Sequence, residues 1–173
     1  IPNELRTLDK YTFSGCSGLT HFYTGDYLHK VESCAFENCA NLETITFGDN
    51  VSTIGGYCCR GCGNLKKIVI GKYVEMIGSE SFYGCKKLTE IYCNAVTPPA
   101  LYYASSNYSP YYFKVPFPKN TDMKIYVPSE AYSTYMSFSN TSSSETVAYQ
   151  TNWAFYKSYI TPYDIENKVE VEL

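Results

Sequence analysis

A repeat of constant length runs through the first hundred residues, and it limits the possible fold more than any other feature. Each unit is too short to hold a long helix. Its Leu-x-x-Ile-x-Ile portion alternates with a period of two, which is typical of a short strand with one buried face. Six columns of equivalent residues, each in four evenly spaced copies without insertions, define the repeat: Cys16, Cys39, Cys62, Cys85; Leu19, Leu42, Leu65, Leu88; Phe22, Ile45, Ile68, Ile91; Leu8, Val31, Ile54, Ile77; Phe13, Phe36, Cys59, Phe82; and Leu5, Leu28, Val51, Val74.

These columns predict a solenoid of about four coils. Each coil consists of a strand, a turn, a short return segment and another turn. Coils stack at about 4.8 Å, the distance between paired strands, and form a parallel sheet. A single coil cannot bury enough apolar surface to fold alone, so stability accumulates between neighbouring coils.

The repeated motif resembles the BspA-type leucine-rich repeats of bacterial surface proteins. The resemblance is carried by Ala35-Phe36-Glu37-Asn38-Cys39 with Leu42, and by Ser81-Phe82-Tyr83-Gly84-Cys85 with Leu88. It implies a leucine-rich-repeat solenoid over residues 1–96, in a protein that is secreted or held at the cell surface. Ile1 falls in register with the end of a preceding unit, so we expect the chain to be cut from a longer protein or to have lost a leader.

The register breaks at Thr97-Pro98-Pro99, because two prolines interrupt strand pairing. We expect residues 97–173 to form a strand-and-helix cap over the last coil, as the resemblance to BspA-type proteins also implies. The predicted elements are a Tyr/Ser loop over 102–112, a strand at 124–128, helices over 129–138 and 152–159, and an edge strand or loose tail from 168 to 173. Trp153 is expected to be buried against the last coil.

The segment CCRGC at residues 58–62 suggests a zinc or redox site, but the repeat explains each of its cysteines separately. Cys62 belongs to the cysteine column, Cys59 to the phenylalanine column, and Cys58 to a column of small residues. Stacked equivalents point in parallel, whereas a zinc site needs four converging ligands. The columns favour buried free thiols, although eight cysteines leave disulfides open. Cys34 is expected to be exposed and Cys93 to lie in the core.

Residues between the buried strand positions point outward and form a small sheet face. It can be a solvated surface with cross-strand pairs such as Lys67 and Glu90, or it can bind a protein or a glycan through its tyrosines. The candidate ligand-binding residues on this face and in the Tyr/Ser segment are His21, Tyr23, Thr44, Thr46, Lys67, Val69, Glu90, Tyr92, Tyr103, Tyr108 and Tyr111.

Other function classes find little support in the sequence. The net charge is −3 without a run of basic residues among aromatics, which argues against nucleic-acid binding, and no apolar run approaches membrane-spanning length. His21 and His29 are the two histidines, and His29 aligns away from the cysteine column. No motif of a nucleophilic, phosphate-binding or zinc enzyme occurs. We therefore predict a non-catalytic binding scaffold without a metal or cofactor, which contacts a protein or glycan at an extracellular surface. A structural spacer is a further alternative.

Overall fold

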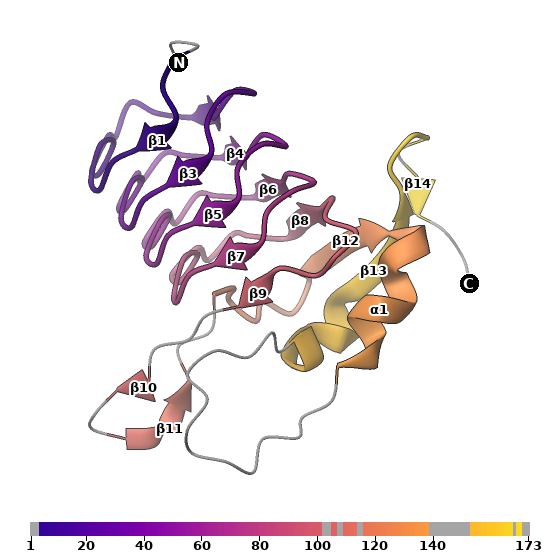
Figure 1. Cartoon of the computed structure of the whole chain (residues 1–173). Coiled ribbons are helices and arrows are strands. Elements are labelled where there is room, and N and C mark those ends of the chain that lie inside the picture. The colour runs from indigo at the N-terminus through magenta and orange to yellow at the C-terminus, as the bar shows by residue number, and fades with distance from the viewer. Residues whose placement is uncertain are drawn as a thin grey trace.

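The chain folds into a β-solenoid closed at its C-terminal end by a cap of a different construction (Figure 1). The computed structural model describes residues 4–101, 105–106, 109–113, 116–138, 153–167 and 169–170. Each turn of the solenoid contributes one strand to a long sheet and one to a short sheet. The predicted stack of evenly spaced coils is confirmed, because paired strands repeat at the spacing of the columns.

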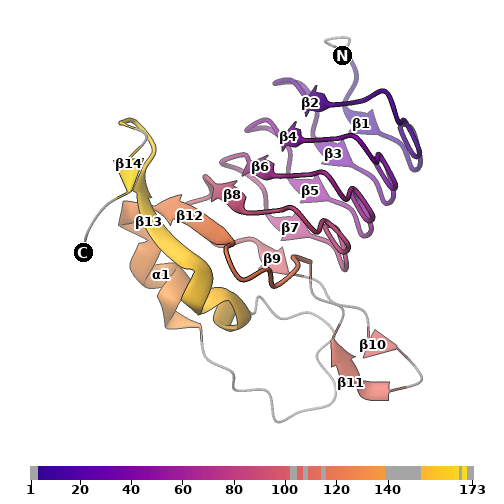
Figure 2. The ribbon, with the colours of Figure 1, turned by 180° about the vertical axis from the view of Figure 1, so that it is seen from behind.

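The long sheet has seven strands in the order β14-β13-β12-β8-β6-β4-β2, and Figure 2 shows most of them one below the other. Strands β2 to β12 are parallel, and register partners in the repeats are residues of the same column position, as in the pairing of Thr44 with Lys67. The strands are β2 (His21–Tyr23), β4 (Thr44–Thr46), β6 (Lys67–Ile70), β8 (Glu90–Cys93), β12 (Lys124–Pro128), β13 (Ile160–Asp164) and β14 (Val169–Glu170).

The short sheet is built from the return segments of the coils, which are two-residue strands rather than irregular chain. Its five parallel strands follow the order β1-β3-β5-β7-β9. They are β1 (Thr7–Leu8), β3 (Lys30–Val31), β5 (Thr53–Ile54), β7 (Met76–Ile77) and β9 (Ala100–Leu101). The step is constant up to β7, where Ile54 pairs with Ile77, but the pairing of Ile77 with Leu101 is longer by one residue. One extra residue therefore enters the turn before β9.

The predicted columns form the core between the two sheets. In the second to fourth coils their members are buried, and Phe36 stacks on Phe13 with ring centroids 5.4 Å apart. The cysteine column also makes hydrogen bonds: the Cys39, Cys62 and Cys85 thiols donate to main-chain carbonyls 26 residues earlier, at Sγ–O distances of 3.0, 3.1 and 3.2 Å. A small apolar side chain with a weak donor suits this position better than a purely aliphatic one.

All eight cysteines are free, and seven of them are buried while Cys16 in the first coil is half-buried. Burial raises the pKa of the Cys59 and Cys85 thiols, which keeps both protonated at neutral pH. The burial of Cys93 is confirmed. The expectation for Cys34 is wrong, because this side chain is only 8% exposed.

Cys34 occupies one of two corner positions where every coil adopts a left-handed backbone. At the first corner, Tyr11, Cys34, Tyr57 and Glu80 have φ between 52° and 64°, although none is glycine. At the second corner the residues are Gly15, Asn38, Gly61 and Gly84. Left-handed φ is unfavourable for most side chains, so the stacking of successive coils must hold the first corner in place.

The cap begins by continuing the solenoid instead of ending it. Phe82 N donates to Pro116 O at 2.9 Å, as Phe36 N donates to Cys58 O in the next coil at 2.8 Å. Phe117 then stacks on Phe82 with a centroid distance of 5.4 Å and an interplanar angle of 7°. Strand β12 pairs with β8 as β8 pairs with β6. The predicted strand at 124–128 is confirmed.

The remainder of the cap covers the open end of the core. The expected helix at 129–138 is a 3-10 turn, η1 (Ser129–Ala131), followed by α1 (Tyr132–Ser137), and the expected helix at 152–159 is a 3-10 helix, η2 (Trp153–Tyr159). Trp153 is fully buried as predicted and donates through Nε1 to Pro99 O at 2.9 Å.

Two strand features of the cap differ from expectation. Strand β13, which contains Pro162, was not predicted because proline argues against a strand interior. It pairs in parallel with β12, and β14 pairs with its end as an antiparallel edge strand. The expected loop over 102–112 contains an antiparallel pair, β10 (Ser105–Ser106) and β11 (Ser109–Phe113), which forms a separate small sheet (Figures 1 and 2).

Candidate functional site

The outer face of the long sheet carries two rows of side chains that cross the strands. Because strand residues alternate between faces, each strand contributes one residue to each row, and the residue between these two points inward. The polar row consists of His21, Thr44, Lys67, Glu90 and Lys124, and the apolar row of Tyr23, Thr46, Val69, Tyr92 and Tyr126. The eight predicted strand residues all lie in these rows. The residues between them are fully buried from Ile45 to Ile125, and Phe22 on β2 is partly buried.

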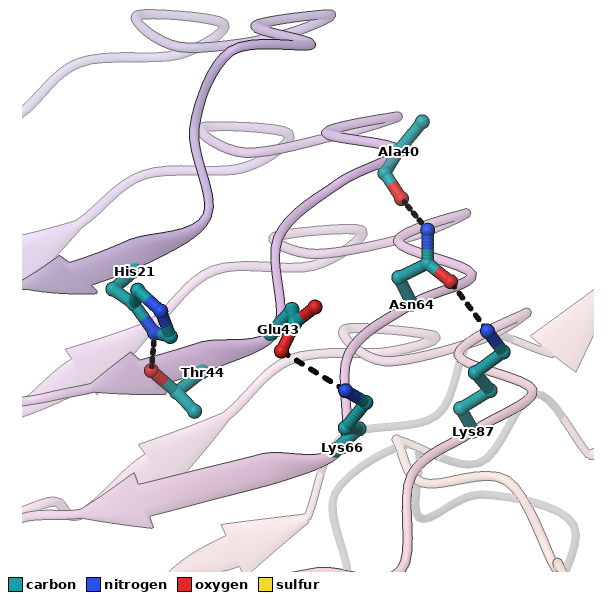
Figure 3. Close-up of polar contacts among 7 residues, drawn as sticks. All are labelled: His21, Ala40, Glu43, Thr44, Asn64, Lys66 and Lys87. Carbon is teal, nitrogen blue, oxygen red and sulfur yellow. Dashed lines mark hydrogen bonds and ion pairs between the residues drawn. The ribbon is translucent and has the colours of Figure 1, made fainter.

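Neighbours in the polar row bind one another across the strands. His21 Nδ1 and Thr44 Oγ1 are 2.7 Å apart, as Figure 3 shows. Lys67 Nζ lies 3.9 Å from Glu90 Oε2, so the predicted cross-strand pair is present. Both side chains of this pair are more than 40% exposed, and such surface pairs contribute little to stability. They fix charges in place on the face.

A second set of polar contacts runs along the chain segments that lead into the strands. Lys66 Nζ lies 2.9 Å from Glu43 Oε2, and this hydrogen bond lowers the pKa of Glu43. Asn64 Nδ2 donates to Ala40 O at 2.9 Å, and Lys87 Nζ donates to Asn64 Oδ1 at 2.8 Å (Figure 3). These contacts again join residues in successive coils. The repeat therefore aligns polar side chains in the segments before the strands as well as apolar side chains in the core.

Three tyrosines gather where the repeats meet the cap. Tyr92 and Tyr126 stack with centroids 4.6 Å apart and an interplanar angle of 17°. Tyr163 from β13 packs edge-on against Tyr92 at 5.2 Å and tilted against Tyr126 at 5.6 Å. All three side chains are partly exposed. We call Tyr92, Tyr126 and Tyr163 the tyrosine cluster.

Tyr92 is among the candidate residues predicted from the sequence, whereas Tyr126 and Tyr163 are not. The signal for Tyr126 was present, because the predicted strand at 124–128 places it after Tyr92 once Ile125 is aligned with the buried Ile91. Tyr163 had no such signal, since its strand contains Pro162 and does not share the step of the repeat.

Both faces of the Tyr92 ring are in contact with other side chains. Lys67 Nζ lies 4.3 Å from the centroid of the Tyr92 ring, on the side of β6, while Tyr126 stacks on that ring from the side of β12. A cation over an aromatic face is itself a favourable contact. The Tyr92 ring therefore presents its edge and its phenolic hydroxyl rather than an open face.

The opposite end of the apolar row is more exposed. Tyr23 on β2 is 52% exposed, and its hydroxyl donates to the carboxylate of Asp26. This hydrogen bond, assisted by partial desolvation, raises the pKa of Tyr23 to about 12. Thr46 and Val69, between the two tyrosine-bearing ends, are partly exposed.

The remaining predicted residues are in the Tyr/Ser segment. Tyr103 and Tyr108 lie outside the described residues. Tyr111 belongs to β11, and its side chain is also outside the described part. The structure therefore does not place these three tyrosines relative to the two rows.

The described part of the chain also contains histidines, cysteines and carboxylates, the residue types of metal sites and of cysteine nucleophiles. No group of three or more His, Cys, Asp or Glu side chains there could hold a metal ion. His21 and His29 are both exposed, and the cysteine column is buried behind the strands from its second member onward. Among the same residues, no helix has the length and apolar character needed to cross a membrane.

Comparison with known protein families gives a match over most of the chain. The family model described as BspA type Leucine rich repeat region matches residues 1–110 in six copies. The matched region includes the four coils and extends past the Thr97-Pro98-Pro99 turn. A search of curated proteins found no match.

Proposed function

The chain belongs to the BspA-type leucine-rich repeat family, and from this premise we propose that it is a non-catalytic scaffold whose outer sheet face binds a protein partner at an extracellular surface. The family suggests a repeat-based scaffold for protein interaction or adhesion, and its members are commonly associated with the cell surface. Secretion of this chain, the extracellular setting and the choice of surface are the new parts of the proposal.

The observation that carries the proposal is the pair of parallel rows on the outer face. The apolar row has tyrosines at both ends, and the polar row beside it holds Lys67, Glu90 and Lys124 at adjacent strands. The sheet fixes these side chains before any partner arrives, which reduces the entropy lost on binding. Tyrosines supply contact area, and the fixed charges select the orientation of the partner.

The geometry of the tyrosine cluster favours a protein over a glycan on this face. A sugar ring binds an aromatic side chain through an open ring face. On Tyr92 both faces are occupied, one by Lys67 and the other by Tyr126. Ring edges and hydroxyls beside paired charges suit the mixed apolar and polar surface of a protein, where tyrosine is enriched in interfaces.

The proposal is tested with a double variant, Tyr23→Ala with Tyr126→Ala, which shortens both ends of the apolar row without entering the core. Binding of the full chain is measured against an array of extracellular matrix and cell-surface proteins. For any partner found, we expect the double variant to weaken binding at least tenfold, about 1.4 kcal/mol. Tyr83→Ala is the matched control, because Tyr83 is 56% exposed and lies outside both rows. It should bind normally.

The same partner also separates this proposal from the alternatives. If the double variant stays folded and binds like the parent protein, the outer face is the wrong surface. Loss of binding only after deletion of residues 103–111, together with signals on a glycan array, would favour a glycan site in the Tyr/Ser segment. Blank arrays of both kinds would favour the spacer.

A further inference from the structure

A groove of about 360 Å³ lies at the turns that join the two sheets, away from the two rows. Its lining comes from two successive turns, residues 72–75 before β7 and residues 96–98 before β9. The volume is at the lower end of the range for small-ligand sites. We call it the Tyr73 groove.

The groove is located where the repeat changes its step. The turn before β7 follows the regular period, whereas the turn before β9 contains the one extra residue described above. The second turn also contains Pro98, which is buried, and Val96, which is 43% exposed. The groove thus lies between two successive turns of unequal length.

The lining combines an aromatic ring, an apolar floor and a polar rim. Tyr73 is 57% exposed, and Val74 and Pro98 are buried beneath it. Lys72, Glu75 and Thr97 are exposed and supply an ammonium, a carboxylate and a hydroxyl to the rim. Lys72 Nζ lies 5.5 Å from the Tyr73 ring centroid, farther than Lys67 lies from Tyr92.

We propose that the Tyr73 groove binds a single sugar ring of a glycan. A pyranose has one apolar face of C–H groups and an equator of hydroxyls. The C–H groups are weakly positive and are attracted to the negative face of an aromatic ring. Around such a ring, Glu75 and Thr97 can accept hydrogen bonds from hydroxyls, and Lys72 and Thr97 can donate to them.

This site is independent of the proposed protein-binding face. It uses a different edge of the solenoid and a tyrosine with more than half of its surface exposed, in contrast to the enclosed ring of Tyr92. The competing occupant is an apolar side chain of a peptide. The ring of polar groups around a small apolar floor favours the sugar, because its hydroxyls can bond those groups while its C–H face packs on the ring, whereas an apolar side chain would use the floor alone.

The test uses saturation-transfer difference NMR on the full chain with the methyl glycosides of glucose, galactose, mannose, N-acetylglucosamine and N-acetylneuraminic acid. We expect at least one to bind, with a dissociation constant in the millimolar range that is typical of a small, open site. Tyr73→Ala should abolish nearly all of that signal. Tyr73→Phe should keep most of it, because the ring face remains.

Tyr27→Ala is a closely matched control. Tyr27 is the equivalent residue two coils earlier, is 48% exposed, and has a cation, Arg6, 5.5 Å from its ring centroid. It does not line the groove, so its variant should bind like the parent protein. Equal losses in Tyr27→Ala and Tyr73→Ala would overturn the proposal. So would the absence of a Tyr73-dependent signal from all five glycosides, or a displayed peptide that needs Tyr73 when no glycoside does.

Discussion

The repeats and the cap contribute to one sheet by different means. From β2 to β8 each strand follows the last at the constant step of the repeat, as in the pairing of Lys67 with Glu90, whereas β12 follows β8 after a longer interval, since Glu90 pairs with Lys124. The backbone ladder is parallel in both regions. A ladder needs only correctly placed N–H and C=O groups. The fixed period is required for a different purpose, which is to stack like side chains in the core.

The two regions also close their cores differently. In the repeats, equivalent side chains of successive coils lie on one another, as Phe36 does on Phe13. In the cap, three large aromatics cover the open end of the core, and each donates a hydrogen bond to a main-chain carbonyl. Tyr135 and Trp153 donate to the carbonyls of Ala95 and Pro99 at 2.7 and 2.9 Å, and Tyr156 donates to that of Phe117 at 3.1 Å. Buried carbonyls at the end of a solenoid have no further coil to bond, so a capping side chain must supply the donor.

The largest expected effect comes from breaking the cap. Trp153→Ala removes a fully buried ring and the donor to Pro99, and Phe36→Ala removes an equally buried ring from the repeats. Each should lower the free energy of unfolding by about 3–5 kcal/mol. For a chain of this size the melting temperature should fall by about 6–20 °C. Calorimetry should show one transition in both variants, because the regions share a sheet.

Tyr83→Ala is the control for these two variants, since its ring is largely exposed; its melting temperature should change by no more than a degree or two. If Trp153→Ala melts like the parent protein, or splits the transition so that the repeats keep their original melting temperature, the cap is an independent appendage. The repeats and the cap would then be two independently folding bodies instead of two parts of one.

A smaller effect is expected where successive coils approach most closely. A Cβ on Gly71 would lie 2.3 Å from Gly48 O, so Gly71→Ala must push two backbones apart. We expect a loss of about 1–3 kcal/mol, measured by denaturant unfolding. Gly63→Ala is the control, because nothing lies within 4 Å of its added Cβ and Ala40 occupies the same position one coil earlier. Equal stability of the two variants would show that the spacing of coils is adjustable.

The smallest effect is expected at Cys93, where the repeats meet the cap. Burial raises the pKa of Cys93 from its ordinary 9.0 to about 11. The unfolded chain therefore loses this proton first as the pH rises, and the stability that the neutral thiol provides is intact below pH 9 and lost progressively toward pH 11. At pH 10 the loss is about 1.4 kcal/mol.

Cys93→Ser tests this assignment, because a hydroxyl replaces the thiol beside Tyr135 Oη, which lies 3.3 Å from Sγ, and does not ionise in this range. Its free energy of unfolding should fall less steeply between pH 8.5 and 10 than that of the parent protein. Identical slopes would mean that ionisation of Cys93 does not cause the loss of stability at alkaline pH.

Much of the fold was predictable because it is periodic. The columns identified the coils, the strands that each coil adds to the long sheet and the buried face of each strand. They also indicated the burial of Cys62 and placed Lys67 beside Glu90. Membership of a column did not by itself determine whether a side chain is buried. Cys34 shares its column with the exposed Tyr11, yet it is buried, and its hydrogen bond with Tyr11 raises the pKa of that tyrosine. A column shows which residues occupy the same position, but neighbouring side chains determine how much of each remains exposed.

The step of the solenoid and the residues on its outer face can be read from the amino-acid pattern, since both follow from the period of the repeat and the alternation of strands. The folded chain was needed to show that Tyr163 joins Tyr92 and Tyr126, and that a groove opens beside Tyr73. Tyr163 lies on a strand that contains a proline and does not share the step of the repeat, and the groove lies between two turns that differ by one residue. Such contacts depend on how unlike segments pack together in three dimensions, and a repeat in the sequence carries no information about them.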